Sequence, residues 1–407
     1  MPRYEIRTYK TPIPKKLYSV CEELNKTAAR IYNKTLSITR KTKNKKGYWL
    51  SESSVKKYIR LWASDIEIHS QSKQAFVEEY FHALKSYLKA VRTTSNAKPP
   101  YKTKKYLPFV WKGQTIKLMP DGTLKLPMGR HAEPLLIPTK LLPDTVIKLA
   151  KLIYENGKYY LHLAIEVKIE NEKVKERTNV VSVDLGILRP ITAFDGKQVI
   201  TYHGGELSSK LRYKNKRLAD IQCAMSKCKK DSKRYRKLKR AKKHFLSKIN
   251  NQIRDILHKT TSHFINWCMQ QNACTIVIGD ITNIRQDNNK GKLVNQRLHQ
   301  WMFRKIITMI KNKAELFDIK VKLISEAYTS KICPICGTLN NIKDRNYKCA
   351  CGFEYHRDGV GAINIYKKYL GDSQVVAELA PAVGVRFHSH LRGHGVKYVP
   401  WELAISQ

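Results

Sequence analysis

The sequence is poor in acidic residues and has no long hydrophobic run. Its 407 residues include only 33 Asp and Glu against 77 Lys and Arg, a formal net charge of +44. Such an excess repels itself unless a polyanion is present, so nucleic acid is the expected partner. No stretch approaches the ~18 apolar residues of a membrane-spanning helix, and the N-terminal "MPRYEIRTYK" lacks an apolar signal core. We therefore expect no membrane partner and a cytoplasmic location.

Cysteine is scarce and unevenly placed. Five of the nine cysteines are scattered, and the other four form the pattern C-x2-C-x12-C-x-C: Cys333, Cys336, Cys349 and Cys351. Thiols stay reduced inside the cell, and four thiolates suit tetrahedral Zn²⁺. Because four cysteines close the coordination sphere, the pattern predicts one structural zinc ion in a zinc ribbon at residues 331–352.

The first half of the chain changes its periodicity. Residues from about 15 to 97 follow a helical pattern, with an apolar stripe between Phe76 and Leu88. The pattern then becomes that of strands, with turn signals at "PDG" (120–122) and "ENG" (155–157). We expect a small β-barrel or sheet domain made of residues 1–14 and 98–175, with a helical insert at 15–97. A bundle packed only for stability is the plain alternative for the insert.

The second half follows an order of elements typical of one nuclease fold. Three short strands are followed by a basic helical region from about residue 208 to 271, the buried strand "CTIVIGD", a helix, the strand "IKVKLISE" and the closing helix "DGVGAINIYKKYL". This order predicts an RNase H-like α/β domain at residues 176–330 and 353–370, so the whole chain is α+β and multidomain. Residues 371–407 show no pattern, and we expect a basic, mostly disordered tail.

Two aspartates stand where this fold needs metal ligands. Phosphodiester hydrolysis here uses two divalent cations about 3.5–4 Å apart, and Mg²⁺ prefers oxygen ligands. Asp184 ends the first strand, and Asp358 opens the last helix, where Gly359 and Gly361 permit a close approach. An aspartate that only ends a strand or caps a helix is the plain alternative at each position.

The third carboxylate has two candidates. The strand "TIVIGD" carries Gly279 where a glutamate is expected, and Asp280, one residue on, faces the opposite side of the strand. Glu326 ends the strand "IKVKLIS", which we expect to lie beside the first strand, and its longer side chain can enter the space that Gly279 leaves. We therefore predict Asp184, Glu326 and Asp358 as catalytic ligands of two Mg²⁺ ions, with Asp280 in reserve.

The basic helical region predicts a nucleic-acid surface. Its charge is almost entirely of one sign, which favours phosphate contacts over an ordinary solvated helix face. Such contacts supply affinity without sequence information. The predicted contact residues are Arg212, Lys216, Arg217, Lys233, Arg234, Arg236, Lys237 and Arg240.

These stretches resemble the TnpB proteins of bacterial and archaeal insertion sequences, which are similar to compact type V CRISPR effectors. The resemblance rests on "VVSVDLGILRPITAF", "TIVIGDITNI", "EAYTSKICPICG" and "YKCACGFEYHRDGVGAINIY", and covers the C-terminal half. It implies an RNA-guided DNA endonuclease whose RuvC-like domain is split by the zinc ribbon. It also implies a wedge-like β domain and a helical recognition insert, with a transposon-encoded guide RNA and target double-stranded DNA as partners. The implied setting is a bacterial or archaeal nucleoid.

Two other functions remain open at this point. Gly279 suggests a nuclease-inactive relative that binds DNA under RNA guidance as a repressor. A guide-free DNA-binding accessory protein of transposition would use only the ribbon and the basic helices, and would leave Asp184 and Asp358 unexplained. We expect a monomer in each case.

Overall fold

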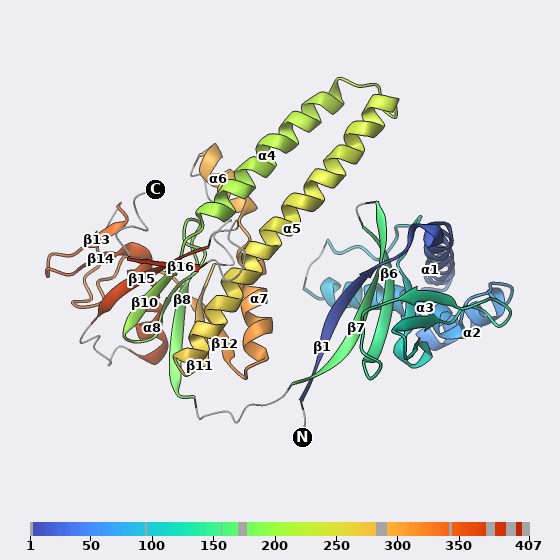
Figure 1. Cartoon of the computed structure of the whole chain (residues 1–407), viewed down its shortest axis with the longest axis horizontal. Helices are drawn as coiled ribbons and strands as arrows, with labels where there is room; N and C mark the ends of the chain where they lie inside the picture. The colour runs from blue at the N-terminus through green and yellow to red at the C-terminus, as the bar shows by residue number, and fades with distance from the viewer. Residues whose placement is uncertain are drawn as a thin grey trace. The chain divides into compact units, whose positions relative to one another are not determined.

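The computed structural model describes residues 3–93, 96–155, 157–169, 177–281, 291–341, 344–371, 379–387 and 396–400. The chain divides into two compact units, residues 1–171 and 172–407 (Figure 1). Within the described ranges, no helix has both the length and the apolar composition needed to cross a bilayer.

The first unit combines three helices with two β-sheets. Its helical elements are η1 (Lys15–Leu17), α1 (Tyr18–Lys46), α2 (Glu52–Trp62), α3 (Ser70–Val91) and η2 (Gly113–Thr115). The larger sheet has the order β1-β7-β6-β2, formed by β1 (Arg3–Pro12), β7 (Lys158–Ile169), β6 (Val146–Glu155) and β2 (Phe109–Lys112). The smaller sheet consists of β3 (Lys117–Leu118), β4 (Thr123–Leu126) and β5 (Leu135–Pro138).

Aromatic packing joins the helices to the larger sheet. Phe76 of α3 meets Phe109 of β2 edge to face, with ring centroids 5.2 Å apart, and Trp111 is fully buried beside them. β1 pairs along its whole length with β7. The segment of chain between these two strands, which are neighbours in the sheet, includes the three helices. The described strands form two separate sheets, so of the two expected arrangements a sheet domain agrees with the structure and a single barrel does not.

The second unit is built on a seven-stranded sheet with the order β12-β11-β8-β9-β10-β15-β16. Its strands are β8 (Asn179–Asp184), β9 (Thr192–Phe194), β10 (Gln198–Tyr202), β11 (Ala273–Asp280), β12 (Lys320–Ser325), β15 (Ala380–Phe387) and β16 (Val396–Pro400). Its helices are α4 (Gly205–Ser226), α5 (Lys233–Gln270), α6 (Lys292–Gln300), α7 (Phe303–Glu315) and α8 (Arg357–Leu370).

The two faces of this sheet carry different residues because side chains alternate along a strand. Val181, Val183, Ile276 and Ile278 pack into the core that also contains apolar residues of α5 and α7. The residues between them face α8, and the Ser182 hydroxyl donates a 2.6 Å hydrogen bond to a carbonyl of that helix. Residues on the α8 face therefore include the ends of the strands that carry the predicted carboxylates.

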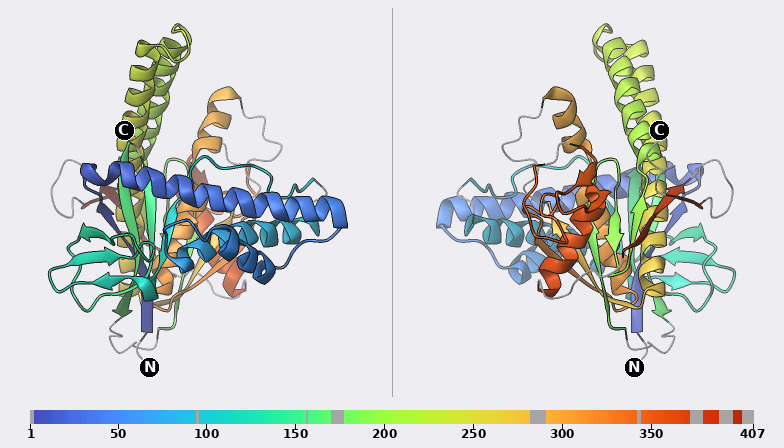
Figure 2. Two further views of the ribbon diagram at one scale, coloured as in Figure 1. Left: turned by 90° about the vertical axis from the view of Figure 1, so that its right-hand side faces the viewer. Right: turned by 90° about the vertical axis from the view of Figure 1, so that its left-hand side faces the viewer.

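Helices α4 and α5 form a long hairpin that extends well beyond the sheet (Figure 1). They remain side by side in both views of Figure 2. The sequence pattern predicted one continuous helical region, but the chain turns at residues 227–232. Asp231 adopts a left-handed backbone with φ 62°, and the Ser232 side chain caps α5 by accepting a hydrogen bond from the Tyr235 amide.

A small hairpin lies between β12 and α8 in the chain. β13 (Asn346–Lys348) pairs with β14 (Glu354–His356), and Ile332 forms an isolated bridge with Leu339. The predicted ribbon boundary at residue 352 is therefore too early, because β14 belongs to the hairpin and leads directly into α8.

The predicted disorder of the tail is wrong for two segments. β15 pairs in parallel with β10, and β16 pairs with β15, so residues 380–387 and 396–400 extend the sheet. Residues 372–378, 388–395 and 401–407 lie outside the described residues.

Candidate active site and cysteine cluster

The register of three parallel strands brings two predicted carboxylates to one face. Val183 of β8 is opposite Ile278 of β11, so one step further the strands carry Asp184 and Gly279 side by side. Gly279 is in turn paired with Ile324 of β12, so β12 lies beside β11 and the expectation that it lies beside the first strand is wrong. Glu326, two residues beyond Ile324, follows the same alternation toward the α8 face.

The side chain of Glu326 occupies the space above Gly279. A Cβ added at position 279 would lie 3.1 Å from Glu326 Oε2 and 3.0 Å from Ile365 Cδ1 of α8. A side chain at 279 and the present position of Glu326 therefore exclude each other. This is the placement that the sequence predicted for Glu326.

Asp184 contacts α8 at a second glycine. A Cβ at Gly361 would lie 2.9 Å from Asp184 Oδ2 and 3.1 Å from Asp184 Cγ, closer than real Cβ atoms approach a fixed group. Only glycine lets the helix pass this close to the carboxylate. The small residues after Asp358 thus allow α8 to approach the sheet closely, as the sequence indicated.

Asp358 lies at the start of α8 and is held by two neighbours. Its backbone N–H donates to His356 Nδ1 at 3.1 Å, so the histidine caps the helix. Its Oδ2 is 3.3 Å from Arg189 Nη1, and the Arg189 side chain is only 6% exposed. Burial, followed by the charges of Arg189, Arg345 and Arg357, lowers the pKa of His356 to about 3, so this ring is neutral and can accept the bond.

Burial and nearby negative charges disfavour the charged forms of Asp184 and Glu326. The pKa of Asp184 is raised well above its ordinary value by burial first, and then by the negative charges of Asp358 and Glu326. The pKa of Glu326 is raised to about 7 by burial and then by the charge of Asp280. A cation at this face would relieve both effects. Asp280 itself is exposed, on the opposite side of its strand from Gly279.

The three predicted carboxylates do not form a compact cluster. Within the described ranges, only the four cysteines bring their ligand atoms within 4.8 Å of one another. Two ions about 3.5–4 Å apart, each with Mg–O bonds of about 2.1 Å, allow ligands at the two ends to be up to about 8 Å apart. Asp184, Glu326 and Asp358 thus do not form a compact cage for a single ion, and a two-ion site does not require one.

Asn364 connects the elements that carry Glu326 and Asp358. From α8 its buried side-chain amide donates to the carbonyls of Thr329 and Ile332, each at 2.7 Å. Thr329 in turn donates from its backbone N–H and hydroxyl to the Glu326 carbonyl, at 3.2 and 2.9 Å. The turn after Glu326 is therefore fixed to the helix that begins next to Asp358.

Sequence reasoning missed Arg189 and Asn364. Arg189 follows Asp184 by five residues, in "DLGILRP", and a single arginine in a very basic chain gave no signal. Its carboxylate partner is 169 positions away and is recognised only in the fold. Asn364 lies within the closing helix, and nothing in the sequence distinguishes it from the other residues of that helix.

The four cysteines converge at the turn of the β13–β14 hairpin, which contains Cys349 and Cys351. Cys333 Sγ is 3.7 Å from Cys351 Sγ, and Cys336 Sγ is 3.5 Å from Cys349 Sγ. A tetrahedral zinc ion with Zn–S bonds of about 2.3 Å has sulfur–sulfur edges of about 3.8 Å. Contact with Thr338 and backbone N–H groups lowers the pKa of Cys336 to about 6, which favours its thiolate form. The cluster therefore fits Zn²⁺.

All eight predicted contact residues of the basic region are exposed on the α4–α5 hairpin. Arg217 has an acidic neighbour, Asp220, at 3.8 Å, and Arg236 donates through Nε to the Asp231 carbonyl at 2.8 Å. The exposed cations lie on both helices of the hairpin, at Arg212, Lys216, Arg217, Lys233, Arg234, Arg236, Lys237 and Arg240.

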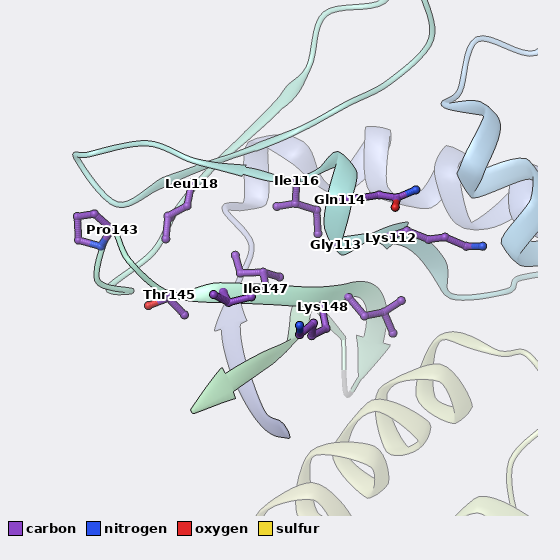
Figure 3. Close-up of a pocket in the computed structure, with 11 residues that line it drawn as sticks. Lys112, Gly113, Gln114, Ile116, Leu118, Pro143, Thr145, Ile147 and Lys148 are labelled. Carbon is purple, nitrogen blue, oxygen red and sulfur yellow. The ribbon is translucent and has the colours of Figure 1, made fainter. Parts of the chain in front are cut away.

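A cavity of about 770 Å³ in the first unit lies between the segments 112–118 and 143–149 (Figure 3). Two lysines line it, but each has a carboxylate partner: Lys112 with Glu78 at 2.9 Å and Lys148 with Glu166 at 3.0 Å. The remaining walls are largely apolar, with Ile116 and Ile147 among them. The cavity thus lacks the uncompensated positive charge of a phosphate site.

Comparison with known proteins identifies two regions of the chain. Residues 162–285 match a family model described as a probable transposase (OrfB_IS605), and residues 303–365 match one described as the Cas12f1-like TNB domain. The second match contains the cysteine cluster, Glu326 and Asp358.

Curated relatives and a solved structure agree with these matches. TnpB-like protein MJ0751 of Methanocaldococcus jannaschii is 34% identical over 143 residues, covering 34% of this chain and 51% of that protein. The CRISPR-associated endodeoxyribonuclease Cas12f2 of a Micrarchaeota archaeon is 26% identical over 255 residues, covering 58% of this chain and 45% of that protein. The chain thus spans about half the length of these relatives.

A solved structure described as the "Cas12f1-sgRNA-target DNA complex" shares the fold, with a TM-score of 0.63 and 14% identity. The match covers 86% of this chain and 83% of that one. The family models and the TnpB-like relatives support a TnpB-family protein, and the solved structure agrees with its mixed α+β fold.

Proposed function

We propose that the protein is an RNA-guided DNA endonuclease of a transposable element, which cuts target DNA by two-metal phosphodiester hydrolysis next to a short motif. The observation that carries this proposal is the side chain of Glu326, which fills the space over Gly279 beside Asp184. It supplies a carboxylate on the α8 face where the strand itself offers none. The strand order β12-β11-β8-β9-β10 supports an RNase H-like, RuvC-type nuclease domain.

In this proposal Asp184, Glu326 and Asp358 hold two Mg²⁺ ions. Bound Mg²⁺ would activate a water molecule and stabilise the leaving oxygen. Asp184 and Glu326 are the carboxylates whose charged forms are disfavoured without a cation, which supports a role as ligands. Arg189 orients Asp358, and Asn364 fixes the turn after Glu326. Asp280 is on the wrong side of its strand and remains only in reserve.

The cysteine cluster would hold one structural zinc ion. Cys333, Cys336, Cys349 and Cys351 provide four thiolates and no open position for substrate. The ion would stabilise the hairpin that separates Glu326 from Asp358 in the chain.

Guide RNA and target DNA are the proposed partners. The Cas12f relatives are named as endodeoxyribonucleases, and the solved neighbour contains a guide RNA and target DNA. In this chain the exposed cations of the α4–α5 hairpin would contact phosphates. We further propose that β1 and residues 98–175 act as the wedge-like domain, and that residues 15–97 act as the recognition insert.

Gly279 favours a second candidate, an RNA-guided DNA-binding repressor without nuclease activity. The two functions differ in one measurement. The purified complex is incubated with Mg²⁺ and a duplex that matches its copurified RNA, next to an Asp184→Ala complex. Cleavage by the wild type that the variant lacks supports the nuclease. Guide-dependent binding without cleavage supports the repressor, and absence of a defined RNA contradicts both.

A further inference from the structure

A second cavity, of about 570 Å³, lies within the nuclease unit. Its walls come from the loop after β8, from α4, and from α6 with the residue that follows it. Ile187, Leu188, Leu211 and Trp301 provide apolar surface. The volume is within the range of about 300–1,000 Å³ typical of small-ligand pockets. None of the proposed metal ligands lines it, so it is separate from the carboxylate site.

One short loop connects this cavity to the carboxylates. Ile187 is three residues after Asp184, so their Cα atoms are at most about 11 Å apart. The loop is fixed by two backbone hydrogen bonds, from Gly186 N–H to the Arg189 carbonyl at 2.9 Å and from Gly204 N–H to the Leu188 carbonyl at 2.8 Å. Its Arg189 reaches Asp358 while Ile187 and Leu188 line the cavity. The loop after Asp184 therefore joins the carboxylate site to a wall of the cavity.

The chemistry of the walls suits a single nucleotide. Leu188 is 40% exposed and offers an apolar surface to a ring, next to the indole of Trp301. Arg212 and Lys216, one turn apart on α4, are exposed at the same cavity and match the charge of a phosphate. The Asn215 amide donates to Gln300 Oε1 between α4 and α6, so amide groups are also present to meet the edge of a base. An apolar peptide would leave both cations without a partner.

We propose that this cavity holds one unstacked base of the DNA strand being cut, with Arg212 and Lys216 on the adjoining phosphate. This inference rests on the proposed nuclease function and adds a base-binding site to it. Since a paired base cannot enter a cavity, the site would select single-stranded DNA beside the scissile phosphate.

The test measures binding, so that it does not depend on cleavage. The RNA-loaded complex carrying Asp184→Ala is titrated with single-stranded DNA oligonucleotides that match its guide. Each oligonucleotide extends beyond the segment that pairs with the guide, and one abasic site is moved stepwise along this unpaired extension. Loss of the base in the cavity should weaken binding about tenfold at one or two adjacent positions, since base stacking on side chains is worth that much. Elsewhere in the unpaired extension an abasic site should have little effect.

A filled cavity provides the decisive comparison. Ser209 lines the cavity from the exposed face of α4, so Ser209→Trp should fill it without disturbing the core. Ser226→Trp, exposed at the far end of the same helix, is the matched control. Ser209→Trp should abolish the position-specific effect, and Ser226→Trp should keep it.

Two results would overturn the proposal. One is an abasic effect that is equal at all positions. The other is a position-specific effect that survives Ser209→Trp. In the cleavage-competent complex, the sensitive position should also be within about two nucleotides of the cut. A complex that binds in this position-specific way and never cuts would contradict the nuclease function while leaving the cavity's role in place.

Discussion

The cysteine cluster and the carboxylate face are two candidate metal sites in one unit, and they are built in opposite ways. The cysteines come from a single stretch, residues 333–351, and a hairpin brings their sulfurs within 4.8 Å of one another. The carboxylates come from residues 184, 326 and 358, at the ends of two strands and the start of a helix. A local site is determined by spacing along the chain. A dispersed site depends on strand register and on how closely a helix approaches the sheet.

The largest predicted effect is that of variants at Glu326, in the dispersed carboxylate site. Glu326→Gln should reduce cleavage by about 10³-fold, since it removes a charge that the proposed ions need. Gly279→Glu alone should also be impaired, because its side chain would collide with Glu326 and Ile365. The double variant Gly279→Glu, Glu326→Gly removes the side chain that fills this space and returns a carboxylate to it, so it should recover at least about tenfold over Glu326→Gln. Cleavage rates on a guide-matched duplex measure all three.

Asp280→Asn is the control for this exchange. Asp280 is exposed on the other side of its strand, so the variant should cut within a few-fold of the wild type. If Asp280→Asn abolishes cleavage and Glu326→Gln does not, the third ligand has been assigned to the wrong residue.

Cys333→Ser should have the next largest effect, confined to the ribbon. Cys333 is buried, and structural zinc contributes directly to the folding of small domains. Bound zinc, measured by atomic emission, should fall from about one ion per chain to near zero. Hydrogen exchange should rise in residues 331–341 and 344–356, while β8 and β11 stay protected. Glu326→Gln should keep its zinc, and loss of zinc from both variants would mean that the two sites are not separate.

Much of the candidate site could be predicted from the sequence because it depends on two simple signals, cysteine spacing and alternation along a strand. Four spaced cysteines predict a cluster that a hairpin can close. Alternation along β11 correctly separated Gly279 from Asp280 and directed attention to Glu326. These inferences needed only neighbours along the chain or one strand away.

The features that were missed depend on contacts between distant residues. β15 pairs with β10, a distant segment of the chain, and its sequence "APAVGVRF" contains Pro and Gly, which are uncommon in strands. The turn between α4 and α5 lies inside a continuous basic run, where charge conceals the Asp231–Ser232 signal. Arg189 becomes important only when α8 brings Asp358 to it.

Asn364→Ala tests how α8, the helix that joins the two sites, positions Glu326. The amide holds Thr329 and Ile332, so its loss frees the turn after Glu326 and leaves two buried carbonyls without this donor. Cleavage should fall about tenfold with little change in DNA affinity or zinc content, because Asn364 positions Glu326 without touching substrate. Lys368→Ala, on the exposed side of α8, should behave as the wild type. A fall in DNA affinity equal to the fall in cleavage would contradict a positioning role.

The smallest effect should appear in the pH dependence of stability. The pKa of Glu326 is about 7 in the folded protein against an ordinary value of 4.5. Between these values the folded chain retains a proton that the unfolded chain has lost, so stability should decrease as pH rises through this window. Without added Mg²⁺ and with zinc retained, Glu326→Gln should melt a few degrees above the wild type at pH 8 and at nearly the same temperature at pH 4.5. Mg²⁺ at pH 8 should raise the Tm of the wild type more than that of the variant. Parallel Tm curves for both proteins from pH 4.5 to 8 would show that the surroundings of Glu326 do not destabilise its charged carboxylate. That charge would then be balanced without added Mg²⁺, like the charge of the thiolates in the zinc-loaded ribbon.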